Sequence, residues 1–462
     1  MSLSIRQIPE NPVLEEHLAL EALGRVVPLE SVNAVLDAEG AREARRRKLP
    51  AAVVVLLCVA MNLFCDRSLG HVFYRLAHGL RLLWPQASDL RASEGAISRA
   101  RYRLGARPLA TLFRAVCRPL ANPETPGAFL FGLRMLAIDS EVLDLADTAA
   151  NEQAYGRATT DRGRSAWPQA WLVGLCECGT HAIVDAGLWP YRTDQHAAAR
   201  RLLRSVGQGT LLMWDCGLHS FDLVTSARRR RAHTLSRLPA GAHPELVQTL
   251  SDGTQLVRLR PSDPKRRRAG EQTLVRLIRY TLDDPNRPGH GEEHRLITSL
   301  LNPRRFAAED LVVAYHSRWE YELTVDEIET HQRPRTPLRS QKPVGVVQEV
   351  YGLLLAHYLV RAVMVDAART ASLPPTRLSF VGALRVIRAT LPDFQHHAPC
   401  DQPTIYQAML EDIVAFKLPE RRNRTNPRVV KQKMSSFRVK RLCHLLWPQP
   451  TKPFRNAIVL LK

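Results

Sequence analysis

Hydrophobic positions recur with a helical period through the first quarter of the chain. Val72, Leu76 and Leu80 repeat every four residues, which is typical of one face of an amphipathic helix. A proline-rich segment at residues 122–127 then interrupts the pattern. We therefore predict an all-helical domain over residues 1–125.

One apolar run in this domain raises the question of a membrane. Residues 49–65 are apolar apart from Asn62. The run is shorter than the roughly 20 residues that a membrane-spanning helix needs. We interpret it as a core helix.

Beyond the break the pattern changes to short apolar runs bounded by turn residues, which predict buried strands. The second and third runs are separated by Gly179 and Thr180 and predict a hairpin. A helical stretch at residues 193–206, with Thr193 as its N-cap, precedes the last run. Three strands, a helix and a further strand indicate an α/β fold. The predicted strands are residues 133–139, 171–178, 181–190 and 209–215.

Two of these predicted strands end in a carboxylate. Asp139 and Asp215 each follow a strongly apolar run and precede a turn-prone neighbour. If the two strands are adjacent, the carboxylates lie at one edge of the sheet and provide the hard oxygen ligands that Mg²⁺ prefers. The alternative is an ordinary turn residue at each strand end. Four further aspartates do not end an uninterrupted apolar strand: Asp144, Asp147, Asp185 and Asp194.

The segment that follows Asp215 is far longer than a crossover helix requires. Alternating residues predict a β-rich insertion over residues 240–303, with a polar, basic loop at residues 261–271. Its positive charge suits contact with a phosphate backbone. The alternative is a structural elaboration that does not touch DNA.

A polar and aromatic stripe comes after the insertion. Tyr315, Arg318 and Glu322 stand at i, i+3 and i+7, so a helix would carry them along one face. A stripe of this composition indicates a functional surface. The alternative is a solvated amphipathic helix with chance ion pairs.

The charge balance points to a polyanionic partner. The chain has 65 Lys and Arg against 45 Asp and Glu, a formal net charge of +20. Basic clusters are spread along the chain and do not flank an apolar anchor, which favours nucleic acid over a membrane. The 8 cysteines are scattered without the paired spacing of a zinc site, which indicates reduced thiols in a cytoplasmic protein.

The basic segments predict where DNA is contacted. Arg99 and Arg103 share one face of a helix predicted at residues 93–105, which resembles the second half of a helix-turn-helix, with Ser98 and Arg101 among the groups presented to DNA. A solvated basic face is the alternative.

The C-terminal third of the chain alternates basic and apolar segments. Residues 329–343 predict an exposed, DNA-facing loop, and residues 349–366 predict an apolar helix that packs against the sheet. Residues 417–441 carry ten Lys and Arg against one acid, which fits phosphate binding as well as a solvated or disordered tail. We predict a helical, basic C-terminal region over residues 346–462.

The segments around Asp139, Asp215 and Glu322 together resemble the cut-and-paste DDE transposases of bacterial insertion sequences. The group they resemble is insertion-sequence family four, with the signature Y-(2)-R-(3)-E-(6)-K. The resemblance implies a ribonuclease-H-like catalytic core with a β-rich insertion over residues 126–345. It also implies that the three carboxylates hold two Mg²⁺ ions, which Mn²⁺ can replace.

By the same resemblance, Tyr315 and Arg318 hold the transposon end. Because two ends must be held together, we expect a homodimer on double-stranded DNA. It would cleave the element's ends and transfer the 3′ ends to target DNA. One position departs from the signature, because Glu329 stands where lysine is expected. His331, Arg333 or Arg335 is then the substitute cation. Otherwise the chain is a weakened or inactive DNA-binding regulator. A stand-alone Mg²⁺ nuclease is a third reading.

Overall fold

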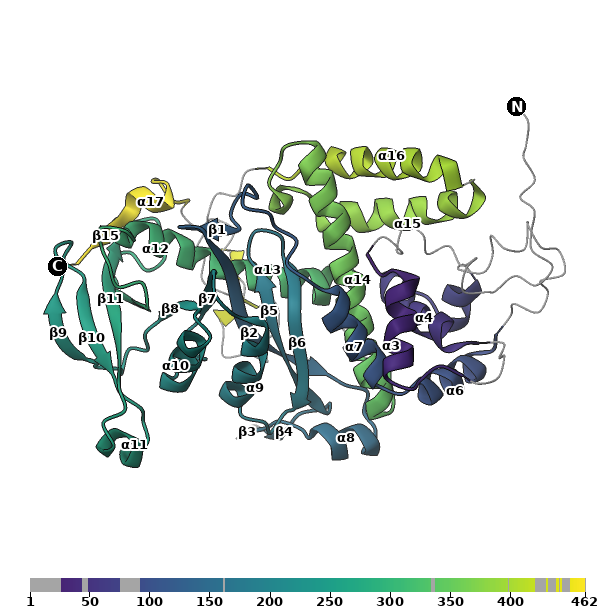
Figure 1. The fold of residues 1–462 in the computed structure, drawn as a ribbon, viewed down its shortest axis with the longest axis horizontal. Coiled ribbons are helices and arrows are strands. Elements are labelled where there is room, and N and C mark those ends of the chain that lie inside the picture. Colours follow the sequence, from purple (N-terminus) through teal and green to yellow (C-terminus); the bar gives the residue numbers. More distant parts are fainter. Residues whose placement is uncertain are drawn as a thin grey trace. The chain divides into compact units, whose positions relative to one another are not determined.

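The computed structural model separates the chain into two compact units (Figure 1). The first unit comprises Met1–Ala128, Ile138–Ser205 and Glu320–Leu418. The second unit comprises Phe129–Ala137, Val206–Trp319 and Pro419–Lys462. The structure describes residues 26–43, 49–74, 92–160, 163–333, 337–397, 399–419, 429–430, 438–439, 441–442 and 449–461.

Helices make up much of the first unit. The apolar run predicted as a core helix is helix α4, Ala51–Leu63, and every one of its residues is buried. Helix α14, Pro343–Thr370, packs along α4 (Figure 1). Gly352 permits this close approach, since a Cβ atom there would lie 2.4 Å from the carbonyl oxygen of Cys58. The other N-terminal helices are α3 (Leu29–Ala38), α6 (Glu94–Leu104) and α7 (Arg107–Val116).

Helix α14 is the core helix of this unit. By length and composition it could cross a membrane, but 89% of its most apolar window is buried inside the protein. It contacts α7 and strand β6 (Ala182–Pro190), as well as two later helices. The prediction that this apolar helix packs against the sheet is therefore confirmed. The later helices are α15 (Phe380–His396) and α16 (Gln402–Ala415).

The sheet of the first unit contains the predicted hairpin. Strand β5 (Gln169–Glu177) pairs antiparallel with β6. The next strand in the sheet is β2 (Leu133–Asp144), which gives the order β6-β5-β2. Helix α9, Gln195–Leu202, packs on β5 and β6. Its N-cap is Asp194, whose carboxylate accepts from two backbone amides, so the prediction of Thr193 as the cap was wrong.

The second unit is built on a mixed sheet. The beginning of β2 pairs in parallel with β7, Thr210–Trp214, and β7 pairs in parallel with β8, His233–Arg237. The remaining pairs are antiparallel, in the order β8-β12-β11-β10-β9. These strands are β9 (Glu245–Thr249), β10 (Gln255–Leu259), β11 (Thr273–Leu282) and β12 (His294–Thr298). Residues 240–303 are therefore rich in strands, as predicted, while their assignment as an insertion in a catalytic core stays a prediction.

Two predictions within the second unit were wrong in detail. The basic loop contains a short helix, α11, Pro264–Arg268, which Asp263 caps.

The C-terminal region does not end as a helix. Its last strand, β15, Ile458–Leu460, pairs antiparallel with β11 after the short helix α17, Phe454–Ala457. Most of the basic stretch 417–441 lies outside the described residues. Helix α10, Phe221–Arg229, follows β7.

The segment that carries the tyrosine, arginine and glutamate is not one regular α-helix. In the second unit, α12, Ala308–His316, ends in the 3₁₀ turn η3, Ser317–Trp319. In the first unit, α13, Glu320–Asp326, leads into the π-helical turn η4, Glu327–Gln332. A 3₁₀ turn has fewer residues per turn and a π turn has more. The predicted single stripe, which assumed a constant period of 3.6, was therefore wrong.

The loop predicted over residues 329–343 is only partly exposed. Its first four residues belong to η4, and Gln332, Leu338 and Ser340 are buried. The Gln332 side-chain amide donates to the carbonyl oxygens of Asn62 and Leu353. Backbone hydrogen bonding and burial on the first unit's own helices outweigh the polar composition of this segment.

Candidate active site

Asp139 lies on β2 directly after the continuous run of buried residues that ends at Ile138. The strand continues to Asp144, so Asp139 is not the end of the strand, contrary to the prediction. The buried part of β2 ends at Ile138, and Asp139 is half-buried. Its Oδ1 atom accepts from the Ser140 amide at 2.8 Å. A carboxylate at this boundary combines a rigid backbone with access to solvent.

Helix α13 is attached to the same part of the sheet. The Tyr321 hydroxyl donates to the backbone carbonyl of Asp139 at 3.0 Å, and burial raises the pKa of Tyr321 well above its usual range. Gly174 on β5 makes room for this ring, because a Cβ atom there would lie 2.8 Å from the Tyr321 hydroxyl. Glu322 follows directly and is half-buried. The first unit thus ties the helical turn of Glu322 to the backbone of Asp139.

Asp215 occupies the corresponding kind of position in the second unit. It directly follows β7, whose five residues are all buried, and is itself half-buried. Its Oδ1 atom accepts from the amides of Gly217 at 2.8 Å and Leu218 at 3.3 Å. These bonds hold the carboxylate in a tight turn. The prediction of a carboxylate at the end of this strand is confirmed.

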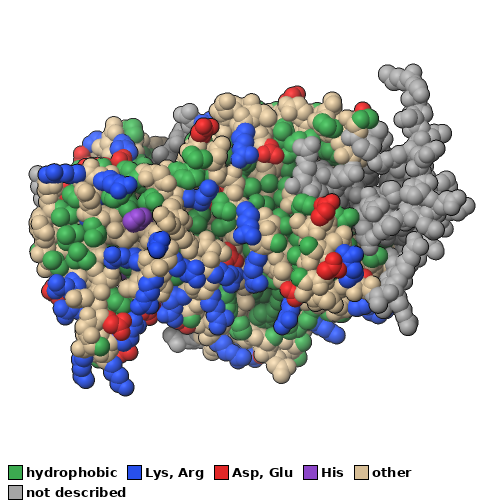
Figure 2. All heavy atoms as spheres, viewed as in Figure 1, with side chains coloured by type: hydrophobic (Ala, Val, Ile, Leu, Met, Phe, Trp, Pro, Cys, Tyr) green, Lys and Arg blue, Asp and Glu red, His purple; other side chains and the backbone are tan. Residues whose placement is uncertain are grey.

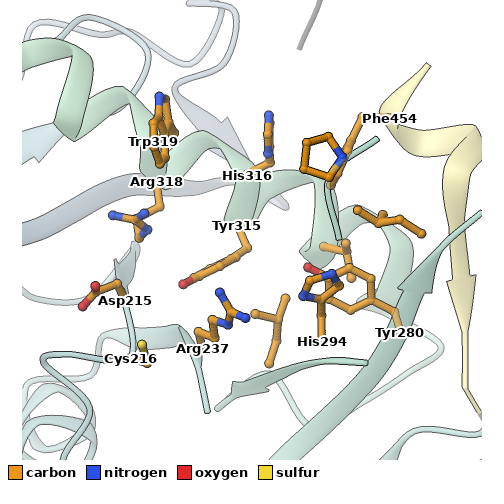
Figure 3. A pocket seen from close by; sticks show the side chains of 14 residues that line it. Asp215, Cys216, Arg237, Tyr280, His294, Tyr315, His316, Arg318, Trp319 and Phe454 are labelled. Carbon is orange, nitrogen blue, oxygen red and sulfur yellow. The ribbon is translucent and has the colours of Figure 1, made fainter. Parts of the chain in front are cut away.

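Asp215 also lines a pocket of about 330 Å³ within the second unit, here called the Tyr315 pocket. Figure 3 shows Tyr315 and Arg318 extending toward Asp215, with the Arg237 guanidinium beside the Tyr315 ring. The remaining walls are largely aromatic. Its labelled lining residues are Asp215, Cys216, Arg237, Tyr280, His294, Tyr315, His316, Arg318, Trp319 and Phe454.

The surroundings of the pocket favour the neutral forms of the Tyr315 and His294 rings. Burial raises the pKa of Tyr315 far above its usual range, with Asp215 adding to the rise and Arg318 opposing it. Burial and the nearby Arg237 lower the pKa of His294. At neutral pH the pocket therefore presents a hydroxyl donor and two guanidinium groups. Such donors suit a phosphate group.

Residues near the signature position of Glu329 form local pairs in the first unit. The Glu329 carboxylate lies 3.9 Å from the Arg333 guanidinium, one helical turn later. His331 lies 3.5 Å from Asp326. Arg335 lies outside the described residues. Of the two candidate cations that the structure describes, Arg333 is the one that pairs with Glu329.

The arginines predicted to contact DNA on α6 differ in their surroundings. Arg99 is exposed. Arg103 is also exposed but pairs with Glu43 and donates to the carbonyl oxygen of Leu49. Arg101 is buried and bonds to side chains of the α14 region, so its predicted presentation to DNA was wrong. The helix-turn-helix assignment stays a prediction.

Comparisons with known proteins match almost the whole chain to one family. Residues 17–114 match the family described as Insertion element 4 transposase N-terminal, and residues 131–359 match the Transposase DDE domain. The chain is 29% identical over 447 residues to Transposase InsG for insertion sequence element IS4 of Escherichia coli K12, covering 95% of this chain and 96% of that protein. The chain belongs to the DDE transposases of the insertion element 4 family.

Two further similarities accompany this match. The transposase is 27% identical over 258 residues to the Putative transposase InsZ of Escherichia coli K12, covering 53% of this chain and 79% of that protein. The transposase is also similar to a chain in a solved structure of a piggyBac transposase synaptic complex with hairpin DNA. The alignment covers 91% of this chain and 87% of that chain, with 12% sequence identity and a TM-score of 0.41. Family membership makes the transposase an enzyme that cleaves and transfers DNA, and DDE domains use divalent metal ions.

The carboxylates have the donor chemistry that a divalent ion requires. Asp139, Asp215 and Glu322 are all half-buried and offer hard oxygen ligands, the type that Mg²⁺ and Mn²⁺ prefer. Asp139 and Glu322 belong to the first unit and Asp215 to the second. Among the described residues, no three His, Cys, Asp or Glu side chains are gathered as a ready-made metal cluster.

Most lining residues of the pocket were not predicted from the sequence, which indicated only Asp215, Tyr315 and Arg318. Trp319 is 48% exposed and follows Arg318 directly, so the Arg-Trp pair was a usable signal. Phe454 comes from the C-terminal segment and stacks on His316 with ring centroids 4.5 Å apart. Nothing in the local sequence marks Arg237 or Phe454. Arg237 reaches the pocket because β8 pairs with β12, and Phe454 because the segment of α17 and β15 is held by the pairing of β15 with β11.

Basic side chains gather on the surface of the second unit. Figure 2 shows Lys and Arg over the ends of α10 and α11. Exposed members of this group are Arg229, Arg230, Arg231, Lys265, Arg267 and Arg268. The location of these charges agrees with the predicted contact between the insertion and a phosphate backbone, which stays a prediction.

Proposed function

We propose that this transposase binds the terminal inverted repeats of its insertion sequence, cleaves the DNA there and joins the 3′ ends to target DNA. The proposal assigns Asp139, Asp215 and Glu322 as the metal-binding carboxylates within a ribonuclease-H-like core. Divalent ions held there would activate the attacking oxygen and stabilise the leaving oxygen of the phosphodiester. Mg²⁺ is the expected ion, two per active site.

The observation that carries the assignment is the register of β2 and β7. Ala137 is the partner of Met213 in the parallel pairing, and Asp139 and Asp215 each follow their paired residue by two positions. Parallel strands carry equivalent side chains in the same direction along the sheet. The hydrogen bond from Tyr321 to the Asp139 carbonyl supports adding Glu322, its immediate neighbour, to the set.

The Tyr315 pocket supplies the groups that would hold the DNA end. Arg318 offers paired donors to a phosphate, and Tyr315 offers a neutral hydroxyl donor. The exposed Trp319 ring offers a stacking surface for a base. Arg99 and Arg103 on α6 would contribute contacts to the phosphate backbone elsewhere on the end. Because two ends must be held together, we propose that a homodimer acts on the DNA.

Cleavage of a duplex that carries the element's end tests the assignment. Wild type is assayed with Mg²⁺, with Mn²⁺ and with EDTA, beside Asp139→Asn, Asp215→Asn and Glu322→Gln. Each variant should bind the end like wild type and cleave at least about a hundredfold more slowly, since even the loss of an outer-shell partner costs about 10–100-fold. Full cleavage by one variant would remove that residue from the set.

The second candidate is a regulator that binds the same ends without turnover. It is favoured by Glu329, which stands at the lysine position of the family signature and faces Arg333. Wild type that binds the end specifically but does not cleave it with either metal would support the regulator. In that case Glu329→Lys should restore cleavage.

A further inference from the structure

A closed group of ionisable side chains lies beside the helical turn that carries Glu322. We call it the His181 cluster, and its members are His181, Glu320, Glu327, His357 and Arg361. His181, His357 and Arg361 are almost completely buried, and Glu327 is 8% exposed. They come from three places in the first unit: the turn between β5 and β6, the segment of α13 and η4, and α14.

The His181 ring bridges two glutamates on the same helical segment. Its Nε2 atom lies 2.5 Å from Glu320 Oε2, and its Nδ1 atom lies 2.9 Å from Glu327 Oε1. Glu320 precedes Glu322 and Glu327 follows it. One imidazole ring therefore holds the helical turn of Glu322 on both sides.

The far side of Glu327 is attached to the core helix α14. Arg361 Nε donates to Glu327 Oε2 at 2.9 Å, and Arg361 NH2 also donates to Oε1. His357 Nε2 lies 3.1 Å from Glu327 Oε2. These contacts fix the residue at which the α-helical turn changes to the π-helical turn η4. These contacts restrict both the rotation of the helix about its axis and its translation.

Stability alone does not account for this arrangement. Taking charges out of water costs about as much as a buried pair regains, and apolar side chains of similar volume often stabilise a core better. His181 also has a φ of 59°, in the left-handed region that non-glycine residues rarely adopt. Strained residues that the surroundings hold in place are concentrated at functional sites.

We propose that His181 and Glu327 are positioning residues that set the orientation of the Glu322 carboxylate toward a divalent ion. The proposal rests on the assignment of Glu322 as a metal ligand under Proposed function. Its physical basis is that groups around a metal ligand raise metal affinity by holding that ligand in its binding orientation. In the cluster, the His181 ring contacts Glu320 and Glu327 on either side of Glu322, and Arg361 and His357 hold Glu327 on α14.

The test measures Mn²⁺ binding to the full-length protein without DNA, from the loss of the free-ion electron paramagnetic resonance signal. The variants are His181→Asn, which tolerates the left-handed backbone, Glu327→Gln and Glu320→Gln. Glu320 is part-exposed, so its variant should fold even if the other two do not. The matched control is Asp185→Asn, a buried carboxylate of the same hairpin that pairs with Arg204 and Ser205 instead of α13.

We expect roughly tenfold weaker Mn²⁺ binding for His181→Asn and Glu327→Gln, a smaller loss for Glu320→Gln and wild-type binding for Asp185→Asn. Affinity for end DNA should not change. If folded His181→Asn and Glu320→Gln both bind Mn²⁺ like wild type while Glu322→Gln does not, the positioning role is overturned. Wild-type binding by Glu322→Gln would instead overturn the metal-ligand assignment.

Discussion

The His181 cluster of the first unit and the Tyr315 pocket of the second unit both hold ionisable side chains, but in opposite ways. In the cluster, Glu327 is buried against His181 and Arg361 on neighbouring elements. In the pocket, Asp215, Arg237 and Arg318 line a cavity with aromatic and aliphatic walls. A buried network of paired charges specifies geometry, whereas charged groups that line a cavity can contact a ligand that enters it. The first unit therefore has the features of a support, and the second those of a binding surface.

The same substitution in each region should separate these roles most clearly. Arg361→Met leaves Glu327 buried without its cation and should cost about 3–5 kcal/mol of unfolding free energy. Arg318→Met should change stability by less than about 0.5 kcal/mol and weaken binding of end DNA. Urea unfolding and a DNA-binding titration measure the two effects. Equal losses of stability would remove the contrast between the regions.

A smaller loss is expected from adding a methyl group beneath α13. Gly174→Ala places a Cβ atom 2.8 Å from the Tyr321 hydroxyl, and such overpacking costs about 1–3 kcal/mol. Gly207→Ala in the second unit is the control, because its Cβ atom would meet nothing closer than 3.9 Å. Thermal unfolding compares the two. Similar midpoints for both variants would show that the fit of Tyr321 against β5 is loose.

The cluster should also give the protein an acid-sensitive component of stability. Burial by itself would raise the pKa of Glu327, but Arg361 and His181 outweigh it and hold that pKa well below its usual value of 4.5. The stabilisation is therefore complete above about pH 4.5 and is lost as the pH falls through the folded-state pKa. Wild type and Glu327→Gln, unfolded with urea at pH 7 and pH 3.5, should differ more at pH 7. A difference that grew at acid pH would contradict the sign.

The smallest effect on stability is expected in the pocket. Tyr315→Phe should leave the unfolding free energy within about 0.5 kcal/mol of wild type. It should slow end cleavage roughly tenfold, because a hydrogen bond to a charged group contributes about 1.5–3 kcal/mol. Tyr358→Phe is the counterpart in the first unit, where the hydroxyl donates to the Arg118 carbonyl at 2.9 Å. That variant should lose stability and keep its cleavage rate per folded molecule.

Local patterns were sufficient for much of the fold. Uninterrupted apolar runs became the buried strands β2, β5 and β7 and the buried helix α4, because burial of such runs depends little on context. The same patterns failed where the helical period changes. The sequence 315–332 has no proline or glycine to mark the 3₁₀ and π turns, which packing against neighbouring elements imposes.

Which arginines of α6 are buried and which are exposed could not be predicted from their spacing. Arg99, Arg101 and Arg103 alternate on one short helix, yet Arg101 is buried against the α14 region and Arg99 is exposed. Charge alone does not distinguish a DNA contact from a buried anchor. That distinction depends on which partner the rest of the chain brings to each side chain.

By itself, the sequence determined the family, the choice of candidate carboxylates and a net charge of +20, which suits a polyanionic partner. These are properties of residue type and spacing, which survive in the linear order of the chain. Only the tertiary structure decided the register of β2 and β7, the pocket wall from Phe454 and the bridge from His181 to the helix of Glu322. Those features join residues far apart in sequence, and no local pattern records contacts that arise only when strands pair and helices pack.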